Sequence, residues 1–230
     1  MLEYCCVDIH SKSQTIKEEP SFNAVRAKTV MSKLEKIEWT NIWYGNTEIE
    51  KKILLLGDSI TQGYHPVVDR ELGKDYCVCR YTSSKAVDNI YLSREIETIV
   101  NESGSKNFEL VHVNNGIHGA HMSDEEYAKH FDMYIYRLKE LLPDAKFVLA
   151  LSTPITNPCS EFVYADFNAH IINRNKAVKE VGARYNIPVE DLYSVVDGIA
   201  DIRTGDGYHY NGAGYEKLGM TVVKTIKDML

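Results

Sequence analysis

Residues 51–63 read Lys-Lys-Ile-Leu-Leu-Leu-Gly-Asp-Ser-Ile-Thr-Gln-Gly, and this stretch indicates the fold. The unbroken apolar run from Ile53 to Leu56 is typical of a parallel strand buried on both faces, and Gly57 ends it just before Ser59. Open α/β sheets bind their ligands at the carboxyl ends of their strands. The pattern therefore places Ser59 at the ligand-binding edge of a central strand.

A second short block, Asp-Gly-Tyr-His at 206–209, contains residues suited to activate that serine. A serine hydroxyl is a poor nucleophile until a base removes its proton, and a histidine base works best when a carboxylate fixes its tautomer. His209 and Asp206 match these two roles. We therefore predict that Ser59, Asp206 and His209 are catalytic.

The two blocks together resemble the SGNH or GDSL hydrolases. The resemblance rests on Gly-Asp-Ser-Ile-Thr at 57–61, on Asp206 three residues before His209, and on Tyr-Asn-Gly-Ala-Gly-Tyr at 210–215. It implies a serine esterase on a flavodoxin-like sheet that needs no metal or cofactor, with Asp58 as a structural hydrogen-bond acceptor. An α/β-hydrolase elbow would instead need glycine at position 61, where this chain has Thr61.

The resemblance also implies an oxyanion hole that includes the backbone N–H of Ser59. The family's second block supplies a glycine N–H, and the equivalent segment here, residues 81–86, has Ser84 at that position. A backbone donor survives this change because every residue except proline carries an N–H. Ser84 is therefore a predicted donor.

The third block of the family ends in an asparagine whose amide is a further donor. Alignment of residues 110–118 without gaps puts His118 at that position, whereas Asn115 has the expected chemistry three residues earlier. Both stay open as donors, with Asn114 as a third alternative.

Hydrophobic periodicity predicts strands that alternate with helices, which implies a parallel sheet covered on both faces. The expected fold class is α/β, a three-layer α/β/α sandwich with a five-stranded, mostly parallel sheet. Strands are expected at 53–56, 77–81, 110–114, 146–151 and 187–192. Helices are expected at 86–100, from a capping box at Ser123 and Glu126 to Pro143, at 169–185, and after an N-cap at Asn211.

The catalytic domain is expected to span residues 51–230, and residues 1–50 to form an N-terminal arm that packs on it. Within this arm, residues 22–37 have the pattern of an amphipathic helix. Trp39 and Trp43 follow that segment. They either anchor the arm or provide a surface on which a sugar stacks.

Composition limits the partners. The chain has 230 residues, enough for one sizeable core, and its net charge of −7 argues against nucleic acid or an anionic membrane surface. No apolar run approaches the roughly 18 residues of a spanning helix, and residues 1–6 lack the pattern of a signal peptide. A cytoplasmic location is expected, with a secreted form whose signal has been removed left open. The oligomeric state is not indicated.

The five cysteines, Cys5, Cys6, Cys77, Cys79 and Cys159, do not have the spacing of a disulfide framework or a zinc site. Reduced thiols are expected, with Cys77 and Cys79 buried on one face of a strand.

His112, His118 and His121 invite a metal interpretation, but zincin spacing is absent and an activated serine needs no metal. No metal and no cofactor are therefore expected. Lys85 is expected to be solvated.

Three alternatives to a short-acyl esterase remain. They are a lysophospholipase or thioesterase, a non-catalytic binding protein on the same fold, and a phosphate binder at the helix that Ser59 begins. The polar or mixed loops at 154–167 and 115–123 favour a short acyl group on a carbohydrate or small-molecule ester.

Overall fold

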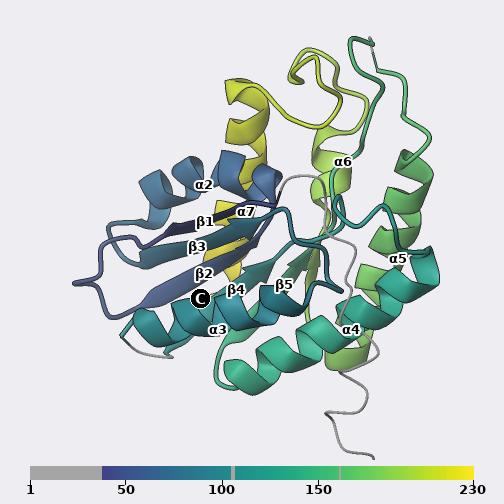
Figure 1. Ribbon diagram of the computed structural model, residues 1–230. Helices are drawn as coiled ribbons and strands as arrows, with labels where there is room; N and C mark the ends of the chain where they lie inside the picture. Colours follow the sequence, from purple (N-terminus) through teal and green to yellow (C-terminus); the bar gives the residue numbers. More distant parts are fainter. Residues whose placement is uncertain (1–37, 105–106, 161) are drawn as a thin grey trace, which may run out of the picture. The chain divides into compact units, whose positions relative to one another are not determined.

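The apolar run of residues 53–56 lies inside a six-stranded sheet in the computed structural model, which describes residues 38–104, 107–160 and 162–230 (Figure 1). The strand order is β1-β3-β2-β4-β5-β6. The strands are β1 (Thr40–Trp43), β2 (Lys52–Gly57), β3 (Cys77–Ser83), β4 (Phe108–Val113), β5 (Lys146–Ala150) and β6 (Val189–Glu190). All neighbouring pairs are parallel except β1 and β3.

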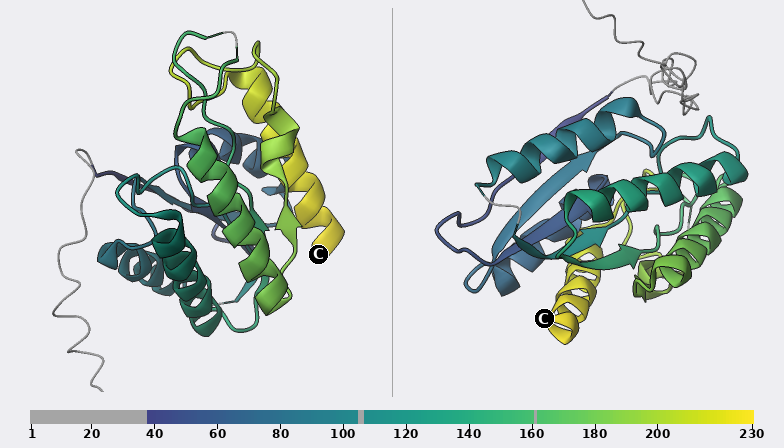
Figure 2. Two further views of the ribbon diagram at one scale, coloured as in Figure 1. Left: turned by 90° about the vertical axis from the view of Figure 1, so that its right-hand side faces the viewer. Right: turned by 90° about the horizontal axis from the view of Figure 1, so that it is seen from below.

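Helices cover both faces of this sheet (Figure 2). They are α2 (Ser59–Leu72), α3 (Ile90–Glu102), α4 (Asp124–Leu141), α5 (Asn168–Tyr185), α6 (Leu192–Val196) and α7 (Gly212–Met229). Side chains alternate along β2, so Leu54 and Leu56 join the core under α3, α4 and α5, while Ile53 and Leu55 join the core under α2, α6 and α7. The predicted three-layer α/β/α architecture is confirmed.

The prediction of five strands is wrong by one, because Thr40–Trp43 forms the edge strand β1. This strand pairs antiparallel with β3, with Thr40 opposite Ser83 and Trp43 opposite Arg80. Its residues are mostly exposed, so they lack the apolar alternation that marks the buried strands. The Trp43 ring makes an edge contact with His65 of α2 at 6.0 Å, which fits the anchoring interpretation better than a sugar-stacking one.

Residues 1–37 of the predicted arm, which include the helix expected at 22–37 and the cysteines at 5 and 6, lie outside the described residues. The assignment of residues 1–50 as an arm stays a prediction.

Most helix boundaries follow their predicted caps. The capping box is confirmed, since the Glu126 N–H donates to Ser123 Oγ at 3.2 Å and the Ser123 N–H donates to Glu126 Oε2 at 2.9 Å. Asn211 caps α7 as predicted. The helix expected from residue 86 begins only at Ile90, because the Asn89 side chain caps it. The strand expected at 187–192 is reduced to two residues, because Asp191 already caps α6.

Cys77 and Cys79 are free and buried on the same side of β3, as predicted, with their sulfur atoms 3.7 Å apart. Burial raises the pKa of the Cys79 thiol to about 12, so this thiol stays protonated. Cys159 is free and exposed.

None of the helices in the described part of the chain combines the length and apolarity needed to cross a lipid bilayer.

Candidate active site

The turn between β2 and α2 places Ser59 at the carboxyl end of a strand flanked on both sides. Asp58 caps α2, and its Oδ1 accepts from the Ile60 N–H at 2.9 Å. Gly57 is required here, because a Cβ on it would lie 2.0 Å from Thr61 Oγ1. Asp58 is fully buried and acts as the structural acceptor that the sequence indicates. The turn therefore holds Ser59 in one position as the first residue of the helix.

Three predicted residues meet at this turn. His209 Nε2 lies 2.8 Å from Ser59 Oγ, and His209 Nδ1 lies 2.6 Å from Asp206 Oδ2. This is the order nucleophile, base and orienting acid, with each side chain in hydrogen-bond contact with the next. The arrangement can take a proton from the serine hydroxyl and stabilise the imidazolium that results.

Asp206 is oriented by more than the histidine ring. Its Oδ1 accepts from the N–H groups of Tyr208 and His209 and from Thr204 Oγ1, each at 2.9 Å. Burial alone would raise the pKa of Asp206, but the N–H group and ring of His209, with the N–H of Tyr208, hold this pKa below its usual range. Asp206 is therefore ionised and can fix the tautomer of His209. Thr204 was not predicted, and its only signal in the sequence is its nearness to Asp206.

The loop that carries the acid and base is tied to the loop that follows β5. Arg203 donates to the Pro154 carbonyl at 3.1 Å and to the Gly207 carbonyl at 2.7 Å. The Gly207 carbonyl also accepts from the Thr156 N–H at 2.9 Å. Gly207 has φ +84°, and a Cβ there would lie 2.2 Å from the Thr156 carbonyl oxygen, so this close approach requires glycine. Sequence reasoning missed Arg203, because no local pattern distinguishes it from a solvated arginine.

The side chains of His209 and Asp206 are open to solvent. The side chain of His209 is 38% exposed and that of Asp206 is 49% exposed. Val163, Tyr164 and Tyr208 are also exposed on the two tied loops. Solvent therefore reaches both side chains that follow Ser59 in the hydrogen-bonded chain.

The predicted role of Ser84 as an oxyanion donor requires correction. The Ser84 N–H donates to the Trp39 carbonyl at 3.2 Å, which extends the β1–β3 ladder by one residue. Because β1 and β2 lie on opposite sides of β3, this N–H is directed away from the strand that leads to Ser59. The Ser59 N–H, in contrast, lies in the first turn of α2, where N–H groups have no partner within the helix.

Asn115 lies at the same end of the sheet as Ser59. Its amide nitrogen donates to the Lys85 carbonyl at 3.0 Å. Asn115 follows β4 and Lys85 follows β3, so this bond crosses the end of β2, where Ser59 begins. An amide nitrogen carries two hydrogens, and only one is used in this bond. Asn114 is directed to the other side, since its amide donates to the Ala150 carbonyl at 3.1 Å on β5.

His118 also approaches the turn. Burial raises the pKa of Asp58, and the proximity of His118, followed by the N–H groups of Ile60 and Thr61, opposes that rise. His118 therefore lies close to the residue that precedes the nucleophile and stays a second candidate donor.

The three clustered histidines have separate surroundings. His112 Nε2 lies 2.7 Å from Glu190 Oε2 in the buried core, and His121 Nε2 lies 2.7 Å from Asp88 Oδ2 beside the 86–88 loop. Within the described ranges, no three histidine, cysteine or acidic side chains gather as ligands for one metal ion.

The prediction that Lys85 is solvated is wrong. It is buried, and its Nζ donates to Thr40 Oγ1 at 2.7 Å and lies 3.2 Å from Glu95 Oε2. This lysine joins the edge strand to α3, so it is not available to a substrate.

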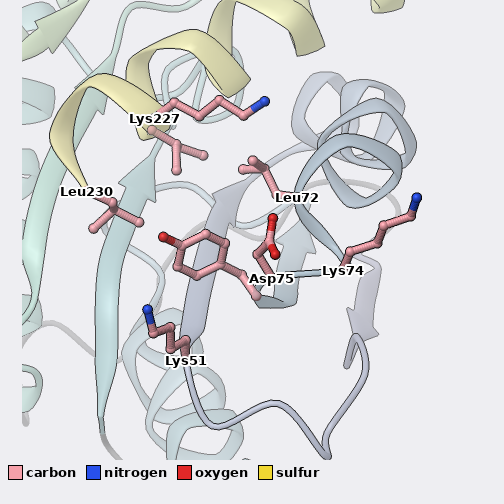
Figure 3. Close-up of a pocket in the computed structure, with 8 residues that line it drawn as sticks. Lys51, Leu72, Lys74, Asp75, Lys227 and Leu230 are labelled. Carbon is pink, nitrogen blue, oxygen red and sulfur yellow. The ribbon is translucent and has the colours of Figure 1, made fainter.

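A pocket of about 520 Å³ lies at the other end of the sheet (Figure 3). Its lining includes Lys51 and Asp75, which precede β2 and β3, and Lys227 near the end of α7. The amino ends of these strands are opposite the end that carries Ser59. The pocket is therefore separate from the catalytic residues.

Comparison with solved structures supports the fold. A GDSL-like lipase from Bacteroides thetaiotaomicron matches with a TM-score of 0.61 and 20% identity, over 79% of this chain and 90% of that one. An aryl esterase from M. smegmatis matches with a TM-score of 0.64 and 15% identity, over 78% of this chain and 100% of that one. A carbohydrate acetylesterase from Sinorhizobium meliloti matches with a TM-score of 0.65 and 12% identity, over 79% of this chain and 100% of that one.

A comparison with models of protein families found no match, and neither did a comparison with curated proteins. At these identities the structural matches establish the fold, which is the flavodoxin-like α/β/α fold of SGNH and GDSL hydrolases. The fold expected from the resemblance is confirmed.

Proposed function

We propose that this chain is a serine esterase that removes short acyl groups, acetyl above all, from carbohydrates or other small polar molecules. The observation that carries the proposal is the continuous chain of hydrogen bonds from Ser59 through His209 to Asp206, at 2.8 Å and 2.6 Å. Nucleophilic acyl transfer requires this sequence of groups, and a binding protein has no need of it.

The proposed reaction uses these three side chains in turn. Ser59 Oγ attacks the acyl carbon while its proton passes to His209 Nε2, and Asp206 stabilises the resulting imidazolium. His209 then gives this proton to the leaving alcohol as the carbon–oxygen bond of the ester breaks, which leaves an acyl group on Ser59. Water, deprotonated by His209, attacks the acyl-enzyme and releases the acid and the free serine.

The negative charge on the acyl oxygen needs donors that are already in place. The N–H of Ser59 is one, at the positive end of the α2 dipole. The Asn115 amide is the second, because its bond to Lys85 crosses the end of β2. His118 is the alternative second donor.

Two observations favour a short acyl group on a bulky polar molecule. The side chains of His209 and Asp206 are 38% and 49% exposed, which leaves room for a large alcohol portion. One of the structures with the same fold is described as a carbohydrate acetylesterase. An acetyl group also needs no extended apolar groove of the kind a long acyl chain would fill.

The test has two stages. A fluorophosphonate probe followed by peptide mass analysis should label Ser59 in the wild-type protein, and Ser59→Ala should remain unlabelled. p-Nitrophenyl esters of two to twelve carbons, followed by acetylated xylan and chitin oligomers, then measure acyl and alcohol preference. Absence of labelling would exclude an esterase and leave the binding protein, and a preference for long acyl chains would favour a lysophospholipase or thioesterase.

A further inference from the structure

Arg174 of α5 is a buried cation that the catalytic triad does not use. Its side chain is completely buried, and its guanidinium carbon lies 4.8 Å from the ring centre of Tyr127 and 5.1 Å from that of Phe167. Burying a guanidinium is costly unless its hydrogens find acceptors. The position of those acceptors therefore indicates what this residue does.

Arg174 donates three hydrogen bonds to one loop, which follows β4. Nη1 donates to the Gly116 carbonyl at 2.8 Å and to the His118 carbonyl at 2.7 Å, and Nη2 donates to the Gly119 carbonyl at 2.7 Å. Three bonds from one planar, rigid group fix the direction of three peptide units. Since a trans peptide is planar, the N–H groups on the far side of these units are fixed as well.

The same loop carries the proposed oxyanion donor. Asn115 immediately precedes the clamped residues, and its own carbonyl accepts from the hydroxyl of Tyr127, one of the two rings that pack on Arg174. The Asn115 amide extends in the other direction, to the Lys85 carbonyl. The loop is therefore held from α4 and α5 on one side and presents an amide across the end of β2 on the other.

We propose that Arg174 is a positioning residue of the oxyanion hole: it holds the carbonyl groups of residues 116–119 and thereby fixes the Asn115 amide beside Ser59. This inference rests on the proposed esterase function. It adds a residue 58 positions from Gly116 that acts through the loop after β4.

Arg174→Lys tests the proposal, because lysine keeps the charge but cannot make three bonds in a fixed planar arrangement. We expect kcat on p-nitrophenyl acetate to fall about 10- to 100-fold with KM within about threefold of wild type, since an oxyanion donor acts in the transition state. Arg184→Lys is the matched control. Arg184 lies on the same helix, 58% exposed, and pairs with Asp132, so kcat should not change.

A double variant separates positioning from general weakening of the fold. If Arg174 acts through Asn115, Arg174→Lys should reduce kcat very little in an Asn115→Ala background, because the donor it positions is already absent. If the fold-loss in kcat of the double variant equals the product of the losses of the two single variants, the proposal is overturned. A normal kcat in Arg174→Lys would overturn it as well.

Arg174→Ala with added guanidinium ions provides a second measurement if the lysine variant does not fold. Guanidinium should occupy the vacated site and restore kcat at least tenfold, whereas ammonium ions should not. No recovery in a folded Arg174→Ala protein would overturn the proposal. Fluorophosphonate labelling of wild-type Ser59 keeps the two claims distinct. If Ser59 is not labelled, both the esterase function and this inference are rejected. If Ser59 is labelled but Arg174→Lys keeps the wild-type kcat, only this inference is rejected.

Discussion

His209 Nε2 lies 2.8 Å from Ser59 Oγ, although 150 positions of sequence separate the two residues. One of them begins α2 and the other lies just before α7, and these two helices cover the same face of the sheet. The packing of α2 against α7 therefore brings Ser59 to His209.

Replacement of the nucleophile is the most direct test of this contact. We expect Ser59→Ala to lower kcat/KM on p-nitrophenyl acetate by roughly 10³-fold or more, with an unchanged unfolding transition, because members of a triad act as a unit. Ser93→Ala, on α3, should keep full activity. Near-normal turnover by Ser59→Ala would rule out the mechanism.

Asp206→Asn should keep the fold but remove the charge that fixes the histidine tautomer. Its side chain is half exposed, so the cost to stability is small, whereas kcat should fall by roughly 10³- to 10⁴-fold. Steady-state kinetics and urea unfolding measure the two effects separately. Asp201→Asn, a nearby exposed carboxylate, is the control, and equal losses in both variants would contradict a specific role for Asp206.

Asn115 and Asn114 form a matched pair for the oxyanion hole. The Asn115 amide donates to the Lys85 carbonyl after β3 at 3.0 Å, and the Asn114 amide donates to the Ala150 carbonyl on β5 at 3.1 Å. Only the Asn115 bond crosses the end of β2. We expect Asn115→Ala to lower kcat about 100-fold or more with little change in KM, and Asn114→Ala to lose mainly stability, by about 1–3 kcal/mol.

His118→Ala completes this comparison. If the Asn115 amide is the donor, His118→Ala should change kcat only a few-fold. A loss confined to His118→Ala would transfer the role to the imidazole, and normal kcat in both variants would leave the hole to backbone groups alone.

His65 should make the protein less stable in acid. Burial, reinforced by Arg80, lowers the pKa of His65 from 6.5 to about 4, and its Nδ1 lies 3.1 Å from Arg80 Nη1. Between these two pH values the unfolded chain binds a proton that the folded protein does not, so the free energy of unfolding falls as the pH falls. The loss is up to about 3 kcal/mol.

Urea unfolding between pH 4 and pH 7 measures this effect. His65→Gln should reduce the slope of unfolding free energy against pH, and His130→Gln on α4 should not. Because the His65 ring contacts Trp43, edge strand β1 should be the first part of the sheet to lose protection from hydrogen exchange in acid. An equal slope in wild type and His65→Gln would contradict the assignment.

Local sequence patterns were sufficient for the main elements of the fold and for the three residues, Ser59, Asp206 and His209, that meet after β2. The four apolar residues at 53–56 predict a buried strand because burial on both faces leaves no polar position. The glycine at 57, the capping box at Ser123 and the cap at Asn211 act within four residues, so they can be read along the chain. The two catalytic blocks are similarly short.

Tertiary structure decided which polar groups are free to act. The sequence leaves the N–H of Ser84 available as a donor, but in the structure it donates to the carbonyl of Trp39, more than 40 residues earlier. Lys85 is likewise buried by its contacts with Thr40 and Glu95. Arg174 likewise looks like any helical arginine until α5 packs beside the loop after β4. The physical reason is that propensity and periodicity depend on neighbours along the chain, whereas the partner of a buried donor or charge depends on which strands and helices lie together in space.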